Sequence, residues 1–171
     1  MIYLPTSPNS THRPTHNEIH RPNTVMNPTT PNPIRSKTSY SIPSTSLTLE
    51  LTLGLDLPLP IASIRSCLTG ALALARTHSP QTLTPATKVS FQQPQSENNA
   101  DALFEIVGDA VFGTNELTWG DVVEVLKGLE QWIEEREKRG EGSLVFWFRI
   151  LEEGEVGKGQ IGDGYLTKKQ P

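Results

Sequence analysis

Two matching segments, residues 59–75 (LPIASIRSCLTGALALA) and 117–133 (LTWGDVVEVLKGLEQWI), decide the predicted fold. When the first is shifted by 58 positions, its apolar residues fall on apolar residues of the second. The matched positions recur every three or four residues, the spacing that places side chains on one face of an α-helix. They are Ile61 and Trp119, Ile64 and Val122, Leu68 and Leu126, Ala71 and Leu129, and Ala75 and Ile133, with Gly70 matched to Gly128. We therefore predict two related amphipathic helices.

Apolar strand patterns precede and follow each predicted helix. Leucine occupies every second position from Leu47 to Leu57, which is typical of a strand with one buried face. A short pattern at 88–92 follows the first helix, and patterns at 102–112 and 143–151 flank the second. The chain thus reads as one strand–helix–strand unit used twice.

The second helix also carries the usual start and stop signals. Thr118 is followed three residues later by Asp121, which is the spacing of a capping box. Gly140, after the basic end of the helix, is suited to the left-handed conformation that ends helices. These signals predict a helix from about Trp119 to Arg139.

Two tandem β-α-β units, residues 46–92 and 102–151, predict an α+β domain. The commonest compact arrangement is a ferredoxin-like antiparallel sheet of four strands, with both helices on one face. The domain is expected to extend to residue 166 through a glycine-rich segment, which we predict to form no more than a ragged edge strand. Residues 167–171 are expected to be a short tail.

The first 45 residues differ from this domain in composition. They contain more than half of the 14 prolines, with Ser, Thr and Asn filling most other positions. Such a segment buries too little apolar area to offset backbone entropy, so we predict a disordered tail.

The net charge of the first 45 residues is +3, whereas residues 46–171 carry −7. A folded domain of that sign repels phosphate, so we expect no nucleic-acid partner.

The sequence shows neither a secretory signal nor an apolar run long enough for a transmembrane segment. A single cysteine, Cys67, excludes an intrachain disulfide and fits a reducing compartment. The localisation is therefore unknown, cytoplasmic by default. Secretion is the alternative if the start is misassigned and an apolar leader precedes it.

Four segments carry a resemblance to a family. The pattern resembles one in short fungal proteins of no assigned function and covers roughly residues 103–159. Its residues are 117–122 (LTWGDV), 128–129 (GL), 146–150 (FWFRI) and 154–159 (GEVGKG). The resemblance supports the predicted fold, and it implies no catalytic residue because the family has no known activity.

Several motifs that often carry chemistry lack the context that the chemistry needs. Residues 157–162 form a G-x-G-x-x-G pattern, but only nine residues follow, too few for the helix and ribose-binding acid of a dinucleotide site. His12, His16 and His20 have helical spacing, but nearby prolines oppose a helix. Cys67 lacks a nearby histidine and is expected to be a small buried residue.

The carboxylates at 152, 153 and 155 are expected to form a solvated turn rather than an acid–base pair. With the motifs above, they leave no predicted catalytic residue, cofactor or metal site.

The remaining candidate is an apolar strip on the face of the sheet that the helices leave open. Residues one step out of phase with the buried positions of two strands point to that face. We predict an interface formed by Leu103, Val107 and Val111 on one strand and by Val145, Trp147, Arg149 and Leu151 on the other. Such a strip is covered by another chain, is covered by the N-terminal tail, or lines a ligand pocket.

Three hypotheses on function follow. The first is a protein without catalytic activity that acts through association, as a homodimer joined by the open face. The second is a cofactor-free protein or enzyme that binds a small molecule in a pocket on the sheet. The third is a secreted effector-like protein whose signal peptide is missing from this sequence.

Overall fold

The computed structural model describes residues 36–54, 59–85, 87–92, 102–108, 116–142, 145–154 and 157–168, all within one compact unit, residues 33–171. Their elements, in chain order, are β1 (Lys37–Ser41), β2 (Leu47–Gly54), α1 (Ile61–Ala75), β3 (Val89–Gln92), β4 (Ala102–Gly108), α2 (Trp119–Lys138), β5 (Val145–Gly154) and β6 (Gly157–Lys168). The predicted α+β class is therefore confirmed.

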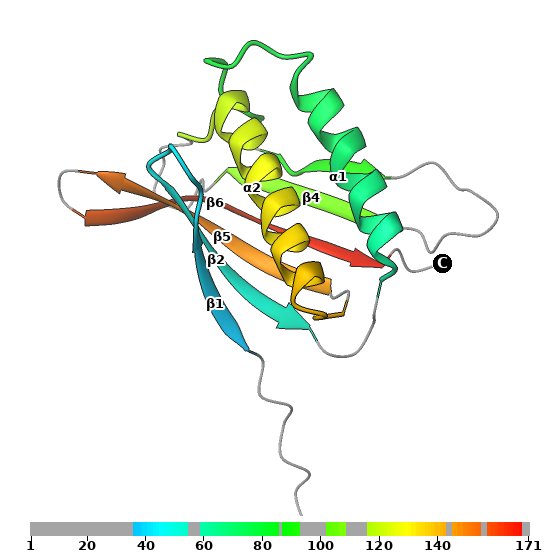
Figure 1. Cartoon of the computed structure of the whole chain (residues 1–171). Coiled ribbons are helices and arrows are strands. Elements are labelled where there is room, and N and C mark those ends of the chain that lie inside the picture. The colour runs from blue at the N-terminus through cyan, green and yellow to red at the C-terminus, as the bar shows by residue number, and fades with distance from the viewer. Residues whose placement is uncertain are drawn as a thin grey trace, which may run out of the picture. The chain divides into compact units, whose positions relative to one another are not determined.

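A single antiparallel sheet contains all six strands, in the order β1-β2-β5-β6-β4-β3. Figure 1 shows α1 and α2 side by side over one face of this sheet. Helix α1 contacts β3 and β4, and α2 contacts β2. The opposite face of the sheet carries no helix among the described residues.

The predicted ferredoxin-like arrangement of two tandem units is not confirmed, because the strand order is more complex. In each predicted unit the two strands lie apart, and each pairs with a strand of the other unit: β2 with β5, and β3 with β4. Strand β6 lies between these two pairs, bonded to β5 on one side and β4 on the other. The glycine-rich segment that was expected at the edge thus forms a central strand.

Glycine allows β6 to occupy the centre because the helix-facing side there is crowded. A Cβ atom built on Gly164 would lie 2.5 Å from Cζ of Phe148, closer than any two such atoms approach. At Gly162 a Cβ would lie 2.8 Å from the carbonyl oxygen of Val107. The missing side chains therefore make room for β5 and β4 on either side of β6.

The boundary of the predicted N-terminal tail is also corrected. Strand β1 pairs with β2 from Lys37 to Ser41, and Ile42, only 4% exposed, belongs to the core. A Cβ on Gly128 of α2 would lie 2.8 Å from Cγ1 of Ile42. The Ile42 side chain therefore packs against Gly128, in the space that a larger side chain would fill. The prediction for residues 1–35 lies outside the described residues.

The predicted helices and their buried faces are confirmed. Buried side chains stand at matched positions of both helices: Ile64, Cys67, Leu68, Ala71 and Ala75 in α1, and Val122, Val125, Leu126, Leu129 and Ile133 in α2. Thr118 Oγ1 accepts a hydrogen bond of 3.2 Å from the Asp121 amide. Asp121 Oδ2 accepts one of 2.9 Å from the Thr118 amide, which completes the capping box. Gly140, with φ of +72°, follows the helix end.

The core lies between the helices and the sheet. The leucines of β2 face it, as the alternation predicts, together with Phe104, Phe146 and Phe148. The rings of Phe104 and Phe148 stack with centroids 6.0 Å apart, and Trp132 of α2 meets Phe146 edge-on at 5.4 Å. This packing fixes which side chains of each strand turn toward the helix-free face.

Candidate functional site

The helix-free face of the sheet carries two rows of side chains that cross neighbouring strands. In the first row, strand register places Thr52 of β2 beside Trp147 of β5, and Trp147 beside Tyr165 of β6. In the second row, Glu50 lies beside Arg149, and Arg149 beside Asp163. Lys37 and Ser39 of β1 extend the two rows at one end.

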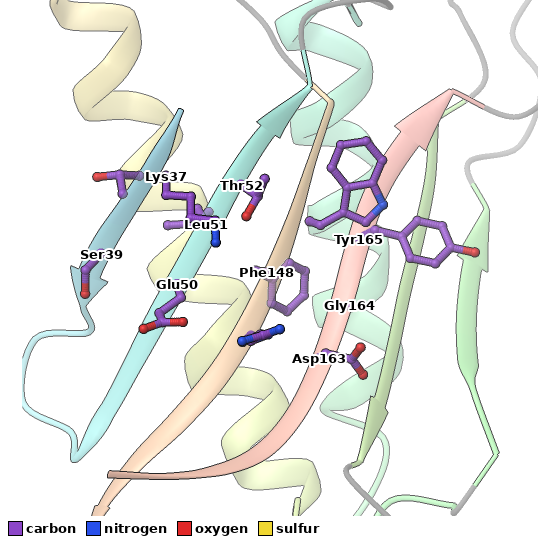
Figure 2. A pocket seen from close by; sticks show the side chains of 12 residues that line it. Lys37, Ser39, Glu50, Leu51, Thr52, Phe148, Asp163, Gly164 and Tyr165 are labelled. Carbon is purple, nitrogen blue, oxygen red and sulfur yellow. The ribbon is translucent and has the colours of Figure 1, made fainter. Parts of the chain in front are cut away.

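These rows surround a hollow of about 620 Å³ on the surface of the sheet. Figure 2 shows this hollow with the helices behind the sheet; Glu50 and Thr52 project from β2, and Asp163 and Tyr165 project from β6, on either side of β5. Its walls come from β1, β2, β5 and β6, so two pairs of successive strands that are distant from each other in sequence build one site.

Trp147 is the largest apolar group at the hollow, and it is 40% exposed. Its ring lies against the bare backbone of Gly54, where a Cβ would stand 3.0 Å from Trp147 Cζ3. Because Gly54 has no side chain, the indole can rest directly on the sheet. The site therefore has a supported aromatic surface that still faces solvent.

Tyr165 is fixed from the other side by a polar network. Lys88 Nζ donates a 3.0 Å hydrogen bond to the Tyr165 hydroxyl, and it lies 5.0 Å from the ring centroid. The same amine forms an ion pair of 2.8 Å with Glu105, which is 8% exposed. Ser90 Oγ donates a 2.7 Å hydrogen bond to the same carboxylate. These contacts hold the phenol ring in place beside Trp147.

The second row alternates in charge from strand to strand. Carboxylates on β2 and β6, Glu50 and Asp163, flank the Arg149 guanidinium on β5, and all three residues are exposed. Within the described chain, neither Glu50 nor Arg149 has an ion-pair partner within 4.0 Å. The hydrogen-bonding groups of this pair are therefore accessible to a molecule in the hollow.

The six predicted interface residues that the structure describes lie on the predicted face, but they do not form one continuous strip. Trp147 and Arg149 are exposed, Leu103, Val107 and Leu151 are half-buried, and Val145 is buried. Strand β6 separates those on β4 from those on β5. Val111 lies outside the described residues.

Sequence reasoning missed the half of the site that other strands supply, namely Glu50, Thr52, Asp163 and Tyr165. The signal in β6 is an alternation in which Gly162, Gly164 and Leu166 face the helices while Asp163 and Tyr165 face away. Small residues on the inner side conceal this alternation from a search for apolar side chains.

Other residues weighed in the sequence lie apart from this hollow. Cys67 is fully buried, as predicted, with Sγ 3.6 Å from the carbonyl oxygen of Ala102. The glycine pattern at 157–162 forms the start of β6.

The described segments hold no group of three His, Cys, Asp or Glu residues placed to bind a metal ion. His12, His16 and His20 lie outside these segments. Neither helix in the described segments is both long and apolar enough to cross a membrane.

Comparison of the chain with protein-family models, curated proteins and solved structures found no match in any of the three. The site must therefore be interpreted from its own geometry.

Proposed function

We propose that this protein acts by binding, rather than by catalysis, through the hollow on the helix-free face of its sheet. The observation that carries this proposal is the meeting of an exposed aromatic ring, Trp147, with polar groups from four strands around about 620 Å³. Ligand sites in proteins typically combine an apolar surface with a few converging polar groups.

The surroundings of the charged groups favour recognition. Glu50 and Asp163 are exposed to solvent, whereas carboxylates that perform acid–base catalysis are usually enclosed in apolar surroundings. The aromatic side, by contrast, is well supported, because Gly54 backs Trp147 and Lys88 holds Tyr165. A supported aromatic surface beside exposed hydrogen-bonding groups is suited to holding a molecule.

The three tryptophans provide a direct test, because Trp119 and Trp132 are each 5% exposed and Trp147 is 40% exposed. The full chain would be labelled with ¹⁵N, and its three indole N–H signals followed by NMR while neutral, anionic and cationic fragments are added. The Trp147→Phe variant assigns the signal of Trp147. We expect fragments to shift that signal and leave the other two in place.

Leu74→Ser is the matched control variant, because Leu74 is 39% exposed and lies on α1, away from the hollow. It should respond to the fragments as the wild type does. Fragments that leave the Trp147 signal unchanged, or that act only on Trp119 and Trp132, would overturn the proposal.

A homodimer joined through the same face is the second candidate function. It is favoured by the position of Trp147 on a face that also carries the half-buried Leu103, Val107 and Leu151. Tryptophan is among the residues that most often dominate the energy of a protein interface.

A further inference from the structure

We propose, as a step that rests on the proposed function, that the hollow binds a neutral oligosaccharide. Three features support this ligand class: the paired aromatic rings, the alternating charged row and the balance of charge around the hollow. Each of them matches one property of a chain of sugar rings.

The aromatic pair matches the apolar side of a sugar ring. Trp147 and Tyr165 are register neighbours on β5 and β6, so both side chains stand on the helix-free surface of the sheet. The face of an aromatic ring carries partial negative charge and attracts the polarised C–H groups that cover one face of a pyranose. An exposed indole supported by Gly54 presents such a face to a ligand.

The charged row matches the hydroxyl groups. A hydroxyl both donates and accepts hydrogen bonds, whereas a guanidinium only donates and a carboxylate only accepts. Glu50, Arg149 and Asp163 present acceptor, donor and acceptor on three adjacent strands. Neighbouring hydroxyls on one sugar ring can therefore bond to neighbouring groups in this row.

The charge of the lining favours a neutral molecule. Lys37 and Arg149 contribute two positive charges, and Glu50 and Asp163 contribute two negative charges. An ionic ligand of either sign would meet one pair of like charges. A neutral molecule with many hydroxyls can use all four groups.

The extent of the hollow favours more than one sugar ring. It runs from β1 across β2 and β5 to β6, which is three interstrand spacings or roughly 14 Å. A second copy of the chain fits less well, because the cores of protein interfaces are depleted of charged residues. Burying the hollow against another sheet would desolvate its four charged side chains at once.

The test is a titration of the full chain with cello-, xylo-, manno-, malto- and N-acetylchito-oligosaccharides, monitored at the Trp147 indole signal and by calorimetry. We expect at least one neutral series to bind. Trp147→Ala should weaken that binding about tenfold or more through loss of the platform. Arg149→Met, which keeps the length of the side chain but removes its donors, should also weaken it about tenfold.

Two controls exclude simple misfolding. Trp147→Tyr keeps an aromatic ring and should retain most of the affinity, and Leu74→Ser should bind as the wild type does. Binding of charged oligogalacturonate or chitosan oligomers in place of every neutral series would overturn the sugar class proposed here and leave the proposed function standing. Neutral series that bind equally well to Trp147→Ala would place the sugar elsewhere and also overturn the inference. If no fragment and no oligosaccharide shifts the Trp147 signal, both proposals fail together.

Discussion

At the centre of the sheet, Gly164 leaves the space that the ring of Phe148 occupies. Adding a methyl group would place it 2.5 Å from Phe148 Cζ and against the carbonyl oxygen of Glu105 on β4, so β6 must shift as well as the ring. Overpacking of this kind costs about 1–3 kcal/mol. We expect Gly164→Ala to lower the free energy of unfolding by that amount, as measured by urea denaturation followed by circular dichroism.

Gly159, on the same strand, provides the matched control. It is exposed, and a Cβ built there meets no described atom within 4 Å. Gly159→Ala should change the free energy of unfolding by less than about 0.5 kcal/mol. Equal effects of the two substitutions would show that neither Phe148 nor the Glu105 carbonyl crowds the position of Gly164.

Tyr40 on β1 carries a second testable feature, a buried hydroxyl without a hydrogen-bond partner among the described atoms. Burial and the nearby negative charge of Glu135 raise the pKa of the Tyr40 phenol above its usual value of 10.0. The folded state therefore favours the neutral phenol. Its contribution to stability is fully present below pH 10 and is lost as the pH rises through the raised pKa.

Tyr40→Phe should accordingly leave stability at pH 7 unchanged or slightly increased, because it removes an unsatisfied polar group. It should also reduce the loss of stability above pH 10. Urea denaturation of both proteins at pH 7 and at strongly alkaline pH measures the two effects. A clear loss of stability at pH 7 would show that the hydroxyl has a partner.

At the scale of elements, β1 shows how a strand with few apolar residues still contributes to the core. It pairs with β2 along five residues, and the following Ile42 is 4% exposed against Gly128. We expect a chain that begins at Ser46 to be less stable than one that begins at Ser36. The loss of the Ile42 side chain alone should cost about 2–5 kcal/mol.

Thermal and urea denaturation of the two truncated chains measure this difference. Ile42→Ala in the longer chain separates the contribution of the side chain from that of strand pairing. Truncated chains of equal stability would show that β1 and Ile42 add nothing to the core, contrary to the burial of Ile42.

The elements that could be predicted from the sequence are those with a strong apolar period. The leucines of β2, the matched faces of α1 and α2 and the phenylalanines of β5 all show such a period. On the helix side, β1 has Thr38 and Tyr40, and β6 has Gly162 and Gly164 before Leu166, so neither strand shows a run of alternating apolar side chains. These strands were missed because small or polar residues interrupt their inner positions.

At the scale of the whole molecule, the position of β6 decides which residues share the site. Sequence alone placed Trp147 and Arg149 on the helix-free face, because period two fixes the face of each residue. It did not give them Glu50, Asp163 or Tyr165 as neighbours, because strand order depends on long-range pairing. The side that a residue faces is local information, whereas the neighbour that it meets is not.

The proposed homodimer would use this same face. If the protein associates through it, Trp147→Ser should keep the chain folded and weaken self-association by about 2 kcal/mol. Leu74→Ser, with nearly equal exposure on α1, should have no effect. Sedimentation equilibrium of the wild type and both variants measures this. A wild type that stays monomeric at high concentration would remove the dimer, and equal weakening by both variants would place the contact elsewhere.

The central place of β6 also governs the order in which the sheet is completed during synthesis on the ribosome. The hairpin β1–β2 and the pair β3–β4 are made early, yet no described strand joins them until β5 and then β6 have left the exit tunnel. The pairing of Leu49 with Ile150 between β2 and β5, for example, cannot form until β5 has been synthesised. Translation proceeds at roughly 5–20 residues per second, so the two early halves wait several seconds with open edges. The last strand to be made closes the sheet, and a chain that lacks only β6 holds β1, β2 and β5 without a strand that joins them to the pair β3–β4.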